Sequence, residues 1–114
     1  VPQLGMWVPG QAPVLCEPRP EEAFAMQGYA GSIAATGERI LVTSPLGGVA
    51  LIFAADGAHV GTDRRAVLCG VACHAGGFTV TDGLGAVWAA SDTGLAPLAQ
   101  GDALWDNHLV ALEA

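Results

Sequence analysis

Residues Val42-Thr43-Ser44-Pro45-Leu46-Gly47-Gly48-Val49 and Val80-Thr81-Asp82-Gly83-Leu84-Gly85-Ala86-Val87 are two versions of one pattern. In each version an apolar run meets a glycine-rich turn and a second apolar run leaves it, with the Leu-Gly pairs in register. The two versions are offset by about 38 residues, which is a spacing typical of blade-type β repeats. The pattern therefore predicts a repeated β architecture over residues 37–98.

Short apolar runs separated by turn-forming residues continue this pattern on both sides. Eight strands are expected in two groups of four, at residues 32–35, 39–43, 49–54 and 58–62, and then at 67–73, 78–81, 86–90 and 95–98. The dividers include Asp56-Gly57, a strong signal for a two-residue hairpin turn. Each group of four is predicted to form one antiparallel blade. A further run at 108–112 would begin another blade or close a ring.

The N-terminal segment differs from these repeats in composition. Residues 1–20 hold five of the seven prolines, and proline gives a strand ladder no N–H donor. Short strands are expected at 5–8 and 13–16. Residues 21–27 are good helix formers that begin with two carboxylates, Glu21 and Glu22, as a helix N-terminus favours. Residues 1–27 are therefore predicted to form a partial blade and a short helical connector.

The strand expected at 49–54 is apolar on both faces, which indicates burial on both sides. Propeller blades pack face to face and account for this, whereas a β-sandwich would not explain the repeat. We therefore predict an all-β fold: a β-propeller fragment of about two to three four-stranded antiparallel blades, from a seven-bladed parent. The predicted divisions are 1–27 for the partial blade and connector, 28–66 and 67–105 for two blades, and 106–114 for a closing or next-blade strand.

Composition limits the partners of this chain. The formal net charge is −7, there is no lysine, and the four cations are all arginine. Nucleic-acid binding needs clustered cations and is excluded on this ground. No apolar run is long enough to span a bilayer. Apolar residues make up 52% of the chain and charged residues 13%, which is more apolar surface than so small a core can hide. We expect this surface to pack on remaining blades, a protein partner or a second copy.

Four segments occur in an order that resembles a known family. They are Gly28-Tyr29-Ala30-Gly31-Ser32-Ile33-Ala34, Val42-Thr43-Ser44-Pro45-Leu46-Gly47-Gly48, Thr81-Asp82-Gly83-Leu84-Gly85 and Trp105-Asp106-Asn107-His108-Leu109. Together they resemble the C-terminal part of an exported bacterial family catalogued as domain of unknown function 1513. The resemblance implies a WD40-like, YVTN-like β-propeller with a twin-arginine export signal and a periplasmic location. It also implies a genetic setting beside imelysin-like and di-haem peroxidase-like proteins, which suggests iron acquisition. No catalytic activity comes with it. Because this chain begins at Val1, it reads as a processed or truncated product.

Trp105-Asp106-Asn107-His108 is the densest polar and aromatic cluster of the sequence. One interpretation is structural: Asp106 and His108 tie neighbouring turns by hydrogen bonds while Trp105 packs between blades. The other is functional: Asp106, Asn107 and His108 line one mouth of a central channel and bind a ligand or a metal. Both interpretations stay open on the sequence alone.

Cys69, Cys73 and His74 form a second candidate cluster. Thiolate and imidazole ligands suit zinc, copper or haem iron. On a regular strand, however, Cys69 and Cys73 would be about 13 Å apart, which is too far for a disulfide or one shared ion. Buried, inert packing of these cysteines is the alternative. No cofactor is implied by this spacing, which is not that of a zinc or covalent haem motif.

The sequence favours a non-enzymatic periplasmic propeller that binds a protein partner or a small ligand, with a possible link to iron acquisition through the resemblance. A metal- or haem-binding propeller is the first alternative. A propeller-type hydrolase is the second, although Ser44 lies in no Gly-x-Ser-x-Gly elbow and no phosphate-binding loop is present. A chain with bare strand edges and apolar faces is also expected to self-associate.

Overall fold

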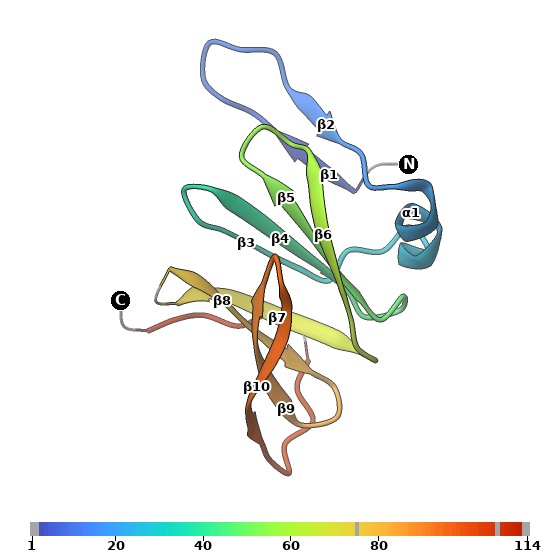
Figure 1. The fold of residues 1–114 in the computed structure, drawn as a ribbon, viewed down its shortest axis with the longest axis vertical. Coiled ribbons are helices and arrows are strands. Elements are labelled where there is room, and N and C mark those ends of the chain that lie inside the picture. Colours follow the sequence, from blue (N-terminus) through green and yellow to red (C-terminus); the bar gives the residue numbers. More distant parts are fainter. Residues whose placement is uncertain (1–2, 75, 107, 113–114) are drawn as a thin grey trace.

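Three antiparallel sheets and one short helix make up the computed structural model, which describes residues 3–74, 76–106 and 108–112 (Figure 1). The N-terminal sheet pairs β1 (Leu4–Met6) with β2 (Val14–Cys16), and α1 (Pro20–Met26) follows it. The second sheet contains β3 (Ser32–Ala35), β4 (Arg39–Ser44), β5 (Val49–Ala54) and β6 (His59–Arg64) in sequential order. The third contains β7 (Leu68–His74), β8 (Gly77–Asp82), β9 (Ala86–Ser91) and β10 (Gly94–Gln100), also in sequential order.

The two four-stranded sheets are consecutive blades, so the chain is an all-β propeller fragment as predicted. Their first strands, β3 and β7, lie against each other, while β6 and β10 meet at the outer side. The eight predicted blade strands and the helix lie within two residues of the observed elements, and the strands at 32–35 and 49–54 have the predicted bounds. The blade boundaries at residues 28, 67 and 106 stay predictions, because strand positions do not fix where one repeat ends. No helix among the described residues is long and apolar enough to cross a bilayer.

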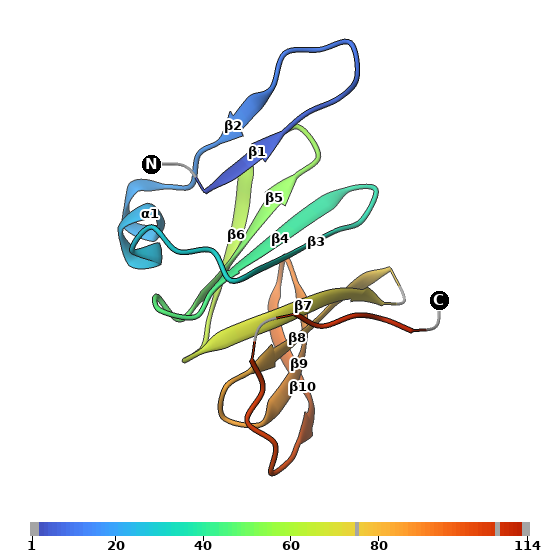
Figure 2. The ribbon, with the colours of Figure 1, turned by 180° about the vertical axis from the view of Figure 1, so that it is seen from behind.

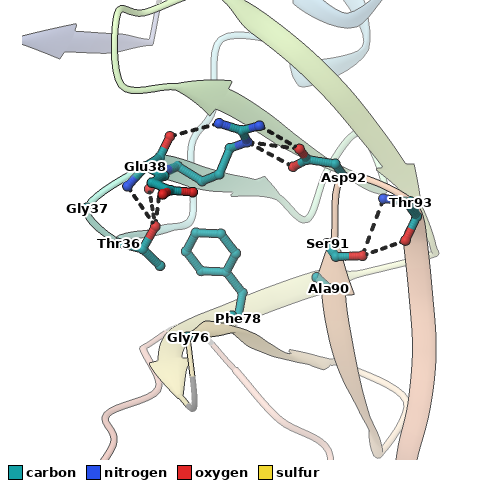
Figure 3. A pocket seen from close by; sticks show the side chains of 11 residues that line it. Thr36, Gly37, Glu38, Gly76, Phe78, Ala90, Ser91, Asp92 and Thr93 are labelled. Atoms are coloured by element: carbon teal, nitrogen blue, oxygen red, sulfur yellow. Dashed lines mark hydrogen bonds and ion pairs between the residues drawn. The ribbon is translucent and has the colours of Figure 1, made fainter.

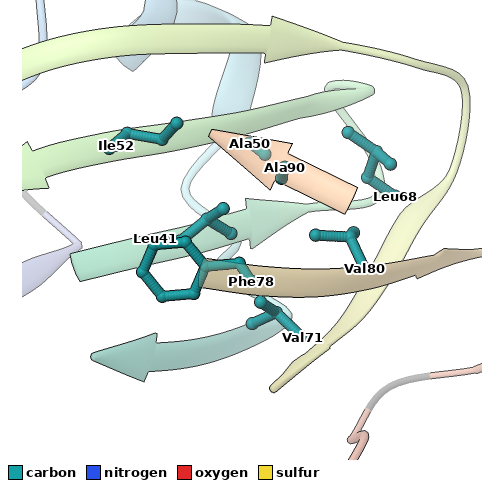
Figure 4. Close-up of a cluster of buried hydrophobic side chains, with 8 residues drawn as sticks. All are labelled: Leu41, Ala50, Ile52, Leu68, Val71, Phe78, Val80 and Ala90. Atoms are coloured by element: carbon teal, nitrogen blue, oxygen red, sulfur yellow. The ribbon is translucent and has the colours of Figure 1, made fainter. Parts of the chain in front are cut away.

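The β5 strand is apolar on both faces because a different cluster covers each face. One side contributes to a core between the two blades, made of the following buried residues: Leu41, Ala50, Ile52, Leu68, Val71, Phe78, Val80 and Ala90 (Figure 4). The other side packs against the N-terminal sheet and α1 in a second core: Leu4, Cys16, Met26, Val42, Val49, Leu51 and Phe53. A strand between two cores needs no polar face, which is why alternation is lost there.

The two repeated turns differ in length, although their sequences align without a gap. Thr43 pairs with Ala50 across the β4–β5 turn, whereas its counterpart Thr81 pairs with Val87 across the β8–β9 turn. The first turn is thus one residue longer, and β5 corresponds to β9 at an offset of 37 instead of 38. The glycine with positive φ before β5 is Gly48, at +63°, and it matches Gly85, at +98°. The Leu-Gly pairs are in register in the sequence, but the glycine with positive φ lies one residue later in the first turn than this register gives.

Gly47 has a separate role, which is close approach to the helix. A Cβ at this position would lie 2.1 Å from the carbonyl oxygen of Ala25, near the end of α1. Ser44 Oγ, at the start of the same turn, lies 2.7 Å from the carbonyl oxygen of Tyr29 and 3.2 Å from that of Met26, and its single hydroxyl hydrogen is shared between these two acceptors. The β4–β5 turn therefore packs against the end of α1 and holds the helical connector in place.

The predictions for the two ends of the chain have different outcomes. The strand expected at 5–8 ends at Met6. Residues 108–112 form no backbone ladder in the part of the chain that the structure describes, and the expectation that they begin another blade or close a ring stays a prediction. This segment runs beside the β7–β8 face, where Leu109 contacts Gly70 (Figure 2). Apolar sequence alone does not make a strand, since a strand needs a partner for its N–H and C=O groups. The rest of the predicted 106–114 element includes residues outside the described ones.

Candidate functional site

A hollow of about 680 Å³ opens between the two blades at the end where their hairpin turns meet (Figure 3). Three turns contribute to it: the β3–β4 turn, the β7–β8 turn and the β9–β10 turn. The lining residues are Thr36, Gly37, Glu38, Arg39, Gly76, Gly77, Phe78, Ala90, Ser91, Asp92 and Thr93. Its volume lies within the range of small-molecule sites, roughly 300–1,000 Å³.

An ion pair between the blades forms one wall of this hollow. Arg39 Nε donates to both carboxylate oxygens of Asp92, at 3.1 and 2.9 Å, and Nη2 lies 2.9 Å from Oδ2 (Figure 3). Arg39 Nη1 donates to the carbonyl oxygen of Glu38 at 3.0 Å. Both side chains of the pair are partly exposed, at 36% and 41%. A planar guanidinium on a carboxylate sets the orientation of the two turns, and it stays within reach of a ligand.

The hydroxyl groups of the rim are engaged in their own turns. Thr36 Oγ accepts the backbone N–H groups of Glu38 at 3.2 Å and Arg39 at 3.0 Å. Ser91 Oγ and Thr93 Oγ lie 2.9 Å apart, within hydrogen-bond distance. These bonds hold the turns in shape before any ligand arrives. The exposed carboxylate of Glu38 adds negative charge to this rim.

Asp63 on β6 is the most perturbed acid near this end. It is 7% exposed, and its partner across the ladder is Ala50, whose side chain belongs to the core between the blades. Its Oδ2 atom is buried without a hydrogen-bond partner. Burial first, and then the negative charge of Asp92, raise the pKa of Asp63 from 3.8 to about 6. A carboxylate oxygen that is buried without a hydrogen-bond donor loses its hydration uncompensated, and this disfavours the charged form of the group.

Of the cluster predicted at Trp105, Asp106, Asn107 and His108, the described residues do not line the hollow. The carbonyl oxygen of Trp105 is near Gly83, in the β8–β9 turn at the opposite end of the blade. Asp106 and His108 are exposed, and Trp105 is 41% exposed. Asn107 lies outside the described residues. Both interpretations of this cluster, structural and ligand-binding, remain predictions.

The second predicted cluster is divided among three environments. Cys69 Sγ lies 2.9 Å from the carbonyl oxygen of Val67, and Cys73 Sγ lies 2.9 Å from that of Ala35, on the neighbouring blade. His74 is exposed and lines a different, smaller cavity beside Leu109. The condition of a regular strand does not hold here, because β7 carries a bulge between Leu68 and Val71.

The three thiols form no disulfide with one another, and two of them are buried. All three cysteines are free. Burial, reinforced by the negative charges of Asp106 and Asp82, raises the pKa of the Cys69 thiol, and burial raises that of Cys16. Metal ligation requires the thiolate, so these environments disfavour it. Among residues 3–74, 76–106 and 108–112, no three His, Cys, Asp or Glu side chains are placed to share an ion.

Sequence reasoning missed the hollow and its ion pair. The turns at Thr36-Gly37 and Asp92 were expected, but nothing in the sequence pairs Arg39 with a residue 53 positions away. The sequence offered no signal for the burial of Asp63, because β6 reads His-Val-Gly-Thr-Asp-Arg and is mostly polar. Asp82 was also missed as an anchor: its Oδ1 accepts the N–H groups of Leu84 and Ala86, both at 2.9 Å, and its Oδ2 accepts Trp88 Nε1 at 3.0 Å.

Comparison with known proteins gives one match. A family model described as "Protein of unknown function (DUF1513)" matches residues 1–112, which is nearly the whole chain. No curated protein and no solved structure gives a significant match.

Proposed function

The chain belongs to the DUF1513 family, and from this premise we propose that it is a non-enzymatic binding module whose ligand or partner side chain enters the hollow between the two blades. The hollow is the observation that carries the proposal, because it joins a ligand-sized volume with a preformed polar rim. Binding sites commonly combine a few fixed polar groups with an apolar floor. Here Phe78 and Ala90 supply the apolar part, and the Arg39–Asp92 pair supplies the polar part.

Charge favours a basic or neutral hydrogen-bonding group as the occupant. Glu38 and Asp92 both line the hollow, and Arg39 is their one cationic neighbour among the lining residues. The formal net charge of −7 adds a negative potential around the whole chain. Such a field speeds the approach of a positively charged partner and slows that of an anion.

The location, the partner and the biological role in this proposal rest on the family resemblance. It supports a periplasmic location, an imelysin-like protein as partner and a role in iron acquisition. Self-association is also part of the proposal, since the N-terminal sheet and helix expose large apolar side chains: Trp7, Val8, Val14, Leu15 and Phe24. Exposed apolar groups of this kind mark contact surfaces.

The test compares binding by the wild-type chain and by a double variant, Arg39→Ala with Asp92→Ala. NMR chemical shifts of the turn amides are followed during titration with a panel of amines, carboxylates and sugars. A pull-down with an imelysin-like protein is run in parallel. We expect shifts at residues 36–39 and 91–93 that the double variant loses. Arg65→Ala is the matched control, because Arg65 stacks over Trp88 at 4.7 Å on the far end of the blades. Equal binding by wild type and double variant would refute the assignment to the hollow.

A further inference from the structure

His59 joins the start of β6 to the connector that precedes α1. Its Nδ1 atom accepts the backbone N–H of Arg19 at 3.0 Å. Its Nε2 atom lies 2.8 Å from the carbonyl oxygen of Gly61 and 2.9 Å from Thr62 Oγ. A backbone N–H can only donate, so Nδ1 must carry no proton and Nε2 must hold the single proton. The imidazole is therefore in its neutral form in this arrangement.

The residue that His59 holds is the one on which α1 begins. Arg19 is the N-cap of the helix, and its carbonyl oxygen accepts the N–H groups of Glu22 and Ala23, both at 3.0 Å. Its guanidinium donates to Thr62 Oγ at 3.3 Å. The connector and β6 are thus joined at the backbone and at the side chain of one residue.

Charged groups around His59 come from the connector and the helix. Arg19 opposes a second positive charge, whereas Glu22 and Glu21 favour one. The favourable effect of Glu22 is reduced, because its carboxylate already pairs with Arg64 at 2.7 Å and lies 3.7 Å from Arg19. On the other side, the ring of Phe53 packs against the imidazole with centroids 5.3 Å apart.

We infer that His59 is a proton-sensitive latch: in its neutral form it holds the connector and α1 on the first blade, and its protonation releases them. A protonated imidazole has two donors and no acceptor, so its Nδ1–H would face the Arg19 N–H. With that bond lost, α1 and the β1–β2 sheet would be held less firmly over Val42, Leu51 and Phe53. A device of this kind suits a chain that must open its N-terminal core to a partner in an acidic setting.

The direction of the pH effect follows from the environment of the ring. Burial first, and then the charge of Arg19, lower the pKa of His59 below 6.5 against the opposing effects of Gly61, Glu22 and Glu21. The folded state therefore prefers neutral His59. The contribution of the latch is present above pH 6.5 and is lost as the pH falls through the folded-state pKa.

Amide hydrogen exchange on the full chain tests the latch, with rates corrected for the intrinsic effect of pH. Between pH 7.5 and pH 5 we expect protection of residues 3–27 to fall about tenfold, the size of effect that one lost hydrogen bond produces, while β7 to β10 change little. His59→Gln keeps an acceptor oxygen and cannot titrate, so its exchange should not depend on pH in this way. His74→Gln is the matched control and should behave as wild type. Wild-type protection of 3–27 that does not change with pH would overturn the inference.

A second pair of variants isolates the hydrogen bond itself. Arg19 has φ −58°, which proline adopts without strain, so Arg19→Pro removes only the N–H and the side chain. Arg19→Ala removes the side chain and keeps the N–H. An NMR titration of the His59 ring should give a higher pKa in Arg19→Pro than in Arg19→Ala, because the bond that favours neutral imidazole is gone. Equal pKa values in the two variants would also overturn the inference.

Discussion

Replacing Asp63 by asparagine should stabilise this protein, and more so as the pH rises. Asp63 lies 7% exposed on β6 with a buried, unpartnered Oδ2, next to a second negative charge at Asp92. Most substitutions at buried positions destabilise. This one removes a charge that the native state accommodates poorly, and it keeps the shape of the side chain.

The magnitude follows from the pKa of Asp63, which rises from 3.8 to about 6 on folding. A shift of this size corresponds to about 3 kcal/mol of unfavourable free energy when the group is ionised in both states. Because the folded-state pKa is raised, this cost is fully present above pH 6 and disappears as the pH falls from 6 towards 3.8. Asparagine brings an amide that also needs a partner, which offsets about 1 kcal/mol. We therefore expect Asp63→Asn to stabilise by about 2 kcal/mol at pH 8.

Urea unfolding followed by tryptophan fluorescence between pH 4 and pH 8 measures the effect. The difference in unfolding free energy between Asp63→Asn and wild type should grow as the pH rises from about 4 to about 6, with half of the change reached at about pH 5, and should level off above pH 6. Asp102→Asn, at an exposed carboxylate after β10, serves as control and should show little change. A difference that stays constant across this range, or a variant that is less stable at pH 8, would refute the reasoning.

Two further predictions concern stability and assembly. Asp82→Asn should destabilise by about 2 kcal/mol at pH 7, because its amide would turn a donor towards Trp88 Nε1. Burial raises the pKa of Asp82, but the hydrogen bonds from Trp88, Ala86 and Leu84 outweigh burial and hold that pKa below 3.8. The destabilisation by Asp82→Asn should therefore shrink only below pH 3.8, which urea unfolding can measure. The chain should also self-associate through its exposed N-terminal apolar surface, and Phe24→Ser should weaken this in sedimentation velocity; a compact wild-type monomer at high concentration would contradict it.

Much of the local structure of this protein was predictable from its sequence. The strands at 32–35 and 49–54 and the helix near 21–27 were recognised because turn residues, proline and apolar runs act over a few neighbours. The same local reasoning does not tell which segments find a pairing partner. Residues 108–112 have strand-like composition, yet they pair with no strand in the described structure and run along the β7–β8 face.

The candidate sites show the same limit. Residues 105–108 were predicted as a site because polar and aromatic residues are adjacent there in the sequence. The hollow, by contrast, is built from turns that are far apart in the sequence. Arg39 pairs with Asp92 only because the two sheets dock in one particular relative placement. The burial of Asp63 depends on the same docking.

The sequence by itself determined the repeat, the strands and the turns, since each depends on side-chain alternation and on the φ values that glycine allows. Tertiary structure alone decided which charges became partners, which acid was left unpaired, and where the chain is hollow. Electrostatic pairing and burial depend on distances between segments, and those distances exist only once the two blades have packed around Leu41, Ile52 and Phe78.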